Sequence, residues 1–174
     1  MTNFAFWLGK LLGQSEHEAT RLLADKSALH FLVAWTLFES RCFQGYVQEK
    51  KIQEYANRVA DESELQLHEL TDIAECFHDR YQDKKRLQNL LYRTQAHHLQ
   101  ALLEKPMASL AKSEIVFLVV FVLYRFRNNM FHGNKGVASW LRYKAQIDLC
   151  TEAMQVFVAF EESRVPTMQR SEAA

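Results

Sequence analysis

The chain has 174 residues, a length that fits one domain with one substantial hydrophobic core. Lys plus Arg equals Asp plus Glu at 21 each, so the chain lacks the overall basic excess that is typical of a nucleic-acid-binding protein. Five Gly and two Pro favour long helices, and three scattered Cys exclude a disulfide framework or a zinc site of the usual spacing.

The first third of the chain predicts three segments. Ser15 followed by Glu18 has the form of a capping box, which starts a helix. The segment from Leu29 to Gly45 carries apolar residues on two neighbouring faces, so we expect a largely buried helix that ends near Gly45. Residues 47–60 are polar and predict either a helix or a long connection.

Helical spacing continues between Leu67 and Pro106, with one interruption. Apolar residues recur at positions 70, 74, 77 and 81, and again from position 87 to position 102. The polar residues 78–85 either kink one helix or separate two helices. Pro106 ends the pattern because proline cannot continue a helix.

A helix that is apolar on all sides follows, and it defines the expected architecture. Residues 115–124 are all apolar, which is typical of a central helix packed on several neighbours. Residues 138–162 then carry apolar positions in near-heptad spacing, and no hairpin pattern occurs anywhere. We therefore expect an all-α bundle of four or five main helices. It would form a single domain over residues 1–174, with its core at about 15–162, an N-terminal arm, and a peripheral tail after about residue 164.

Two apolar segments bear on where the protein is located. The segment 4–12 lacks the basic start and the cleavage site of a signal peptide. The apolar run 115–124 is only half of the roughly 20 residues that a membrane-spanning helix needs. We expect a soluble, cytoplasmic protein that does not enter a membrane.

A heptapeptide follows the apolar run after two intervening residues, Arg125 and Phe126. Its sequence is Arg127-Asn128-Asn129-Met130-Phe131-His132-Gly133. Arg binds phosphate oxygens through a fork of donors, and an imidazole transfers protons near neutral pH. Cleavage of a phosphodiester without a metal needs both functions. Asn128 and His132 share a helix face, but Arg127 lies about 140° away from His132 on an ideal helix. Unwinding of the helix end would bring them together, as would a second copy across a two-fold axis.

The charges around the heptapeptide form a local basic patch. No acidic residue occurs between Glu114 and Asp148, which suits a phosphate backbone. The cations in this window are Arg125, Arg127, Lys135, Arg142 and Lys144. Glu39 lies in a mostly apolar segment and is a candidate to pair with Arg127 or orient His132; the alternative is an exposed residue or a simple salt bridge. A purely structural interpretation also exists, in which Arg127 pairs with a carboxylate and His132 caps the helix.

The spacing Arg127-x4-His132 after an apolar helix resembles the signature of the HEPN superfamily. That signature is Arg, four to six residues of which the first is commonly Asn, and then His. Asn128 and the Phe-His-Gly ending are similar to it, as is the upstream helix with Trp35, Phe38 and Glu39. The resemblance covers about residues 29–160 and implies a small α-helical bundle.

The resemblance implies a metal-independent endoribonuclease that belongs to a toxin–antitoxin or antiviral defence system and uses no cofactor. Arg127 and His132 would be the catalytic pair, Asn128 and Glu39 would support them, and Arg125, Lys135, Arg142 and Lys144 would bind RNA. Two copies would bring their motifs together in a homodimer with a composite active site, and an antitoxin or defence-system protein would be a further partner. Some relatives carry a regulatory Tyr two residues after the His, but this chain has Asn134 there.

Two alternative functions are compatible with the same fold, and neither is catalytic. A non-catalytic module of the same type would hold RNA or a nucleotide on the basic patch. A structural dimerisation domain would use the final helix and leave the motif as a helix cap. RNA cleavage in EDTA separates the enzyme from both alternatives, because only the enzyme gives products. Salt-dependent RNA binding without products indicates the binding module.

Overall fold

The computed structural model describes residues 3–62, 67–131 and 136–164. Every regular element in these ranges is helical, and they contain no strand, which confirms the predicted all-α class. The α-helices are α1 (Phe4–Leu12), α2 (Glu16–Ala24), α3 (Ser27–Phe43), α4 (Glu49–Ala60), α5 (Leu67–Tyr81), α6 (Lys84–Leu91), α7 (His97–Leu103), α8 (Lys112–Phe131) and α9 (Lys144–Ser163). Short 3-10 turns lie at Met107–Ser109 (η1), Val137–Ser139 (η2) and Leu141–Tyr143 (η3).

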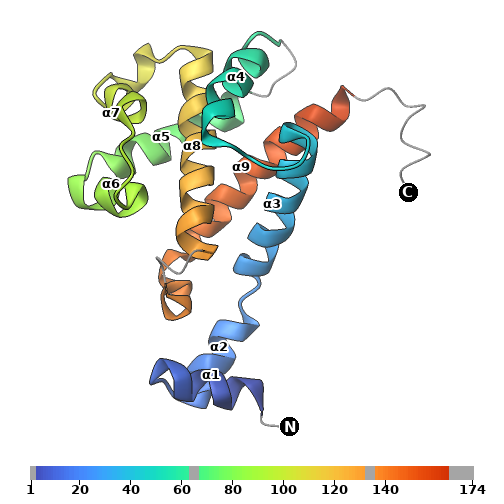
Figure 1. Ribbon diagram of the computed structural model, residues 1–174, viewed down its shortest axis with the longest axis vertical. Coiled ribbons are helices and arrows are strands. Elements are labelled where there is room, and N and C mark those ends of the chain that lie inside the picture. Colours follow the sequence, from blue (N-terminus) through green and yellow to red (C-terminus); the bar gives the residue numbers. More distant parts are fainter. Residues whose placement is uncertain (1–2, 63–66, 132–135, 165–174) are drawn as a thin grey trace.

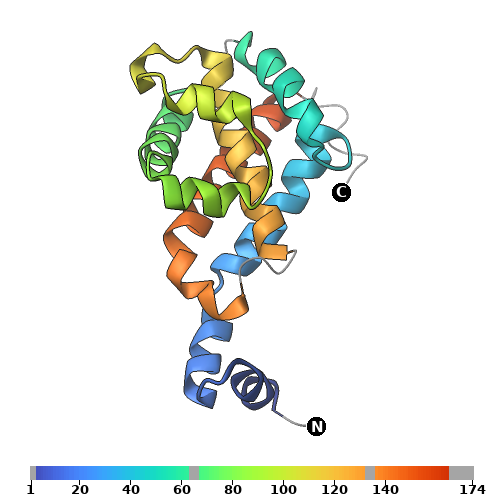
Figure 2. The ribbon, with the colours of Figure 1, turned by 60° about the vertical axis from the view of Figure 1, so that its left-hand side comes forward.

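Helix α8 occupies the centre of the molecule, as its all-round apolar sequence predicts. Its residues from Ile115 to Leu123 are all buried. Helices α4 and α5 make the main contacts with α8, and α3 and α9 pack along each other (Figure 1). Figure 2 shows α5, α6 and α7 gathered on one side of α8. The described residues thus contain more helices than the four or five main ones expected.

The polar interruption after α5 separates two helices. Helix α5 ends at Tyr81, and Asp83 begins α6 by accepting a 2.8 Å hydrogen bond from the backbone N–H of Arg86. A second break lies at Tyr92, whose backbone is left-handed, and it separates α6 from α7. The apolar spacing from position 87 to position 102 predicts one continuous helix there, so the sequence does not predict this break. The side chain of an N-cap residue and a left-handed C-cap residue are the ordinary devices for starting and ending a helix.

Helix α3 is less buried than its sequence predicts. Its face with Phe31, Trp35 and Phe38 lies in the core, and each of these side chains is at most 3% exposed. The neighbouring aliphatic face is between 45% and 57% exposed; it consists of Leu29, Leu32, Val33 and Leu37. The expectation of a largely buried helix is wrong because α3 lies on the outside of the bundle and only one of its faces meets other helices.

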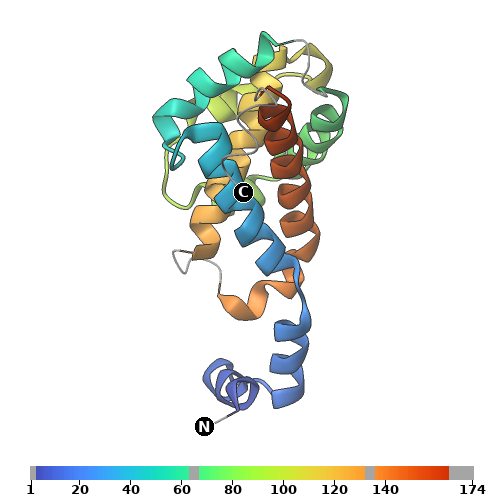
Figure 3. The same cartoon turned by 90° about the vertical axis from the view of Figure 1, so that its right-hand side faces the viewer.

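The N-terminal helices form a hairpin that projects from the body of the protein (Figures 1 and 3). Ser15 and Glu18 form the predicted capping box at the start of α2. Helix α1 ends at Leu12, and the next residue, Gly13, caps it in the left-handed conformation (φ 65°), which suits glycine. Ala5, Leu8, Ala19 and Leu22 close a small apolar cluster between the two helices. The projecting part of the chain extends to Ala24 at the end of α2 (Figure 1).

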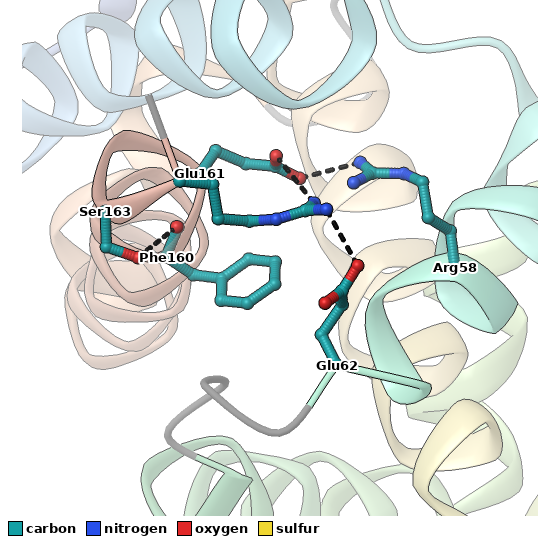
Figure 4. Close-up of polar contacts among 6 residues, drawn as sticks. Arg58, Glu62, Phe160, Glu161 and Ser163 are labelled. Atoms are coloured by element: carbon teal, nitrogen blue, oxygen red, sulfur yellow. Dashed lines mark hydrogen bonds and ion pairs between the residues drawn. The ribbon is translucent and has the colours of Figure 1, made fainter. Parts of the chain in front are cut away.

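Ion pairs join the end of α9 to α4 (Figure 4). The Arg58 guanidinium contacts Glu161 at 2.7 Å, and Arg164 contacts Glu62 at 2.7 Å. Exposed pairs of this kind each contribute about 0.2–1 kcal/mol. The main connection between α3, α4 and α9 is an aromatic cluster beneath them, in which Phe157 contacts Phe38 and Tyr55 at 5.7 Å and 5.9 Å between ring centroids.

The three cysteines have different environments, and we expect them to react differently. Burial raises the pKa of Cys42 to about 12 and also raises the pKa of Cys150, whereas Cys76 is exposed. Because the thiolate is the reactive form, a maleimide at pH 7.5 should label one thiol of the folded protein quickly. Mass spectrometry should place that label on Cys76, and Cys76→Ser should remove it. Rapid labelling of Cys42 or Cys150 would contradict the packing described above.

Candidate functional site

The heptapeptide begins in the last turn of α8. Arg127 to Phe131 are the final residues of that helix. His132 and Lys135 lie outside the described residues, so the expectation that His132 pairs with Arg127 concerns a part of the chain that the structure does not describe.

Arg127 lies between two aromatic rings and one amide. Its guanidinium carbon is 5.6 Å from the ring centroid of Trp35 on α3 and 5.8 Å from that of Phe131, one turn later on α8. Its Nη1 donates a 3.2 Å hydrogen bond to Oδ1 of Asn128. Cation–π contacts of this kind contribute about 0.5–2 kcal/mol each, more as the cation is desolvated. The aromatic rings therefore fix where the guanidinium points.

The guanidinium of Arg127 has no carboxylate partner among the described residues, in contrast to those of Arg58 and Arg164. Its Nε is buried without a hydrogen-bond partner in the same described ranges. The structural interpretation in which Arg127 pairs with an acidic residue therefore finds no support in the described ranges. A half-buried cation that no acidic side chain neutralises is well suited to an incoming anion.

Glu39 does not contact Arg127 in this structure. Its Oε1 accepts a 3.1 Å hydrogen bond from the backbone N–H of Val47, across the turn that follows α3. Glu39 therefore holds the connection between α3 and α4. The other role expected of it, to orient His132, involves a residue outside the described ranges.

Arg125 is part of the core, which corrects the expectation that it contacts RNA. It is 8% exposed, and its Nη2 donates a 2.5 Å hydrogen bond to the carbonyl of Leu91. Asn129 lies one turn later, is fully buried, and donates to the carbonyls of Asn89 and Leu90 at 3.2 Å and 2.8 Å. The two side chains satisfy carbonyls at the end of α6 that have no partner within that helix. Basic residues counted along the sequence do not reveal this use.

The remaining described cations of the basic window are exposed. Lys144 lies 3.1 Å from Asp148 and 3.4 Å from Asp25, and hydrogen bonding to Asp148, followed by the charge of Asp148 and the contacts with Asp25, raises its pKa. Asp25 lies outside the acid-free window in the sequence, but the fold brings it to Lys144. Arg142 lies exposed on η3, where it forms no ion pair or hydrogen bond through its side chain with another described residue. Among the expected RNA contacts, Arg142 is the described one whose exposure best fits that role.

Sequence reasoning missed the role of Trp35. It belongs to the buried face of α3 and is 3% exposed, which by itself indicates a core residue. Only the crossing of α3 beside the end of α8 places its ring against Arg127. No pattern in the sequence signals that contact.

Comparisons with protein-family models, curated proteins and solved structures found no match for the chain. In the ranges that the structure describes, no three His, Cys, Asp or Glu side chains gather where they would hold a metal ion. No described helix has the length and apolar character needed to cross a bilayer.

Proposed function

We propose that the chain is a metal-independent endoribonuclease of the HEPN type, acting as a homodimer in a toxin–antitoxin or antiviral defence system. The observation that carries the proposal is the environment of Arg127. The guanidinium is held by Trp35, Phe131 and Asn128, and no carboxylate among the described residues neutralises it. His132 follows directly after the described end of α8, so a proton-transfer group lies within one residue of Phe131.

The reaction needs one base, one acid and one positive charge. His132 of one copy removes the proton from a ribose 2′-hydroxyl, and the 2′-oxygen forms a bond to the adjacent phosphorus. The bond from phosphorus to the 5′-oxygen breaks, and the leaving oxygen takes a proton from the partner subunit's His132 in its protonated form. Arg127 neutralises the charge that builds on the phosphoryl oxygens. The products are a 2′,3′-cyclic phosphate and a 5′-hydroxyl end, with no net change in redox state.

Two copies solve a geometric problem that one copy leaves open. On a regular helix, Arg127 and Phe131 share a side, and a residue at position 132 projects about 100° further round. A second motif across a two-fold axis would bring an imidazole to the guanidinium; unwinding of the helix end is the other way in which the two groups could meet. The composite site therefore combines Arg127 with the imidazoles of both copies, one as the base and the other as the acid.

The experiment that tests this function is RNA cleavage in EDTA by the wild-type chain, Arg127→Ala and His132→Ala. Loss of products in both variants, with RNA binding retained, would support catalysis. Full activity in His132→Ala would overturn the mechanism. Salt-dependent RNA binding without products in the wild type would instead identify the non-catalytic alternative.

Arg125 and Arg142 provide a matched pair of variants with opposite expected effects. Arg125→Ala should lower the free energy of unfolding by about 1.5–3 kcal/mol, because the buried carbonyl of Leu91 loses its charged hydrogen-bond donor. Arg142→Ala should change stability by less than about 0.5 kcal/mol, weaken RNA binding, and reduce the salt dependence of binding by about one phosphate contact. Urea unfolding and filter binding measure these effects. Equal loss of RNA affinity in two stably folded variants would contradict the assignment of Arg125 to the core.

A further inference from the structure

Two apolar surfaces have no partner among the residues that the structure describes. The first is a groove of ≈ 590 Å³ between α3 and α9, which lie side by side (Figure 3). Its walls are mostly apolar, and the small side chains of Ala34 and Ala159 leave it room; the polar residues that line it are His30, Thr151 and Gln155. The main apolar residues that line it are Leu29, Val33, Leu37, Met154 and Val158.

The second surface is the outer face of α1. Phe4, Trp7 and Leu11 are 58%, 48% and 65% exposed, and they follow one another at positions i, i+3 and i+7. The rings of Phe4 and Trp7 contact each other at 5.2 Å between centroids, so the face is a continuous ridge. Phe6 extends it on one side and is 51% exposed. The ridge has the spacing by which an amphipathic helix anchors in an apolar groove.

From these two surfaces we infer that α1 of one copy seats in the α3–α9 groove of a second copy, and that a two-fold axis makes the exchange reciprocal. The α1–α2 hairpin already projects from the body, so α1 is presented to another molecule without unfolding (Figure 1). A contact between two different patches closes into a dimer when a two-fold axis relates the copies, so that both contacts form at once; without that symmetry it continues into a ring or a filament.

The area available fits a stable dimer. The ridge and the exposed face of α3 would each bury on the order of 400 Å², because each consists of four large apolar side chains that are 45–65% exposed and would add roughly 100 Å² apiece. A reciprocal exchange would then bury about 1,600 Å² over both copies, which is the standard size of a specific protein–protein interface.

A lipid surface is the competing occupant for α1, and the charges of the helix disfavour it. Interfacial helices combine an apolar face with a polar face rich in Lys and Arg. Helix α1 contains one cation, Lys10, and has nine residues. A membrane would also leave the α3–α9 groove uncovered.

The experiment is sedimentation velocity of the full chain over a range of concentrations, without RNA. The wild type should be a dimer. Trp7→Glu on the ridge and Leu37→Glu in the groove should each raise the dimer dissociation constant by roughly thirtyfold or more, as expected for a buried anchor. Leu23→Glu on α2 is the matched control, because Leu23 is also 48% exposed but lies outside both surfaces, and it should behave as the wild type.

A covalent test identifies which surfaces meet. In a Cys76→Ser background, Phe6→Cys, which keeps Trp7, and Val33→Cys should form an intermolecular disulfide when the two variants are mixed. A monomeric wild type would overturn the inference, as would a dimer that Leu37→Glu disrupts and Trp7→Glu does not. Trp7-dependent sedimentation with vesicles of phosphatidylcholine and phosphatidylserine, in place of dimerisation, would assign α1 to a membrane and also overturn it. The inference does not rest on the ribonuclease proposal, since no arm of the test measures cleavage.

Discussion

Arg127→Ala and His132→Ala are each expected to lower the rate of RNA cleavage in EDTA by at least about a hundredfold. Loss of a positioned charge stabiliser costs about 10²–10³-fold, and loss of a general acid or base costs about 10²–10⁴-fold. Trp35 and Phe131 hold the guanidinium in place before RNA arrives, so its removal takes away a preorganised group. Single-turnover cleavage of a labelled RNA measures the effect directly.

The conservative variant Arg127→Lys separates charge from geometry. Lysine keeps the positive charge but lacks the planar fork that lies against Trp35 and donates to Asn128. We expect Arg127→Lys to retain RNA affinity and to lose most of the cleavage rate. If it cleaves as fast as the wild type, Arg127 acts as a simple charge and the positioning by the two rings is unimportant.

Substrate controls test the nucleophile. Because the proposed attack comes from the ribose 2′-hydroxyl, DNA and 2′-O-methyl RNA of the same sequence should remain uncut. Products from unmodified RNA should end in a 2′,3′-cyclic phosphate. Cleavage of DNA at a comparable rate would exclude this reaction for the chain, even with both variants inactive.

The sequence predicts the elements of the fold better than their exposure. The apolar run 115–124 forms half of α8 and predicts a central helix because no face of it suits water, and its residues from Ile115 to Leu123 are all buried. The apolar residues of α3 look equally suited to a core, yet Leu29 and Val33 are more than half exposed. Periodicity states which residues share a face, but not whether another helix of the same chain covers that face.

The candidate site illustrates the same limit for charged residues. The motif is visible in the sequence because Arg127 and His132 are close along the chain. Arg125 looks equally available, but its partner, the carbonyl of Leu91, is 34 residues away, and the fold alone brings them together. Lys144 likewise meets Asp25 through tertiary contact. Long-range polar contacts have no local pattern, so they appear only in the structure.

Phe157→Ala is expected to lower the free energy of unfolding by about 3–5 kcal/mol, the largest stability effect we expect from a single substitution. Phe157 is fully buried on α9, where its ring contacts Phe38 of α3 and Tyr55 of α4. Truncation leaves a cavity where three helices meet and removes both ring contacts, each worth about 0.5–1.5 kcal/mol beyond area burial. Urea unfolding followed by circular dichroism measures the change.

Two further substitutions make this result specific to packing. Phe157→Leu keeps most of the volume and should cost less than about 1.5 kcal/mol. Tyr46→Ala removes an aromatic ring that is 63% exposed and should cost less than about 0.5 kcal/mol. If Phe157→Ala were no more destabilising than Tyr46→Ala, then α3, α4 and α9 would not close over this ring. That result would also count against the α3–α9 contact that forms the groove, because Phe38 of α3 and Phe157 of α9 pack against each other there.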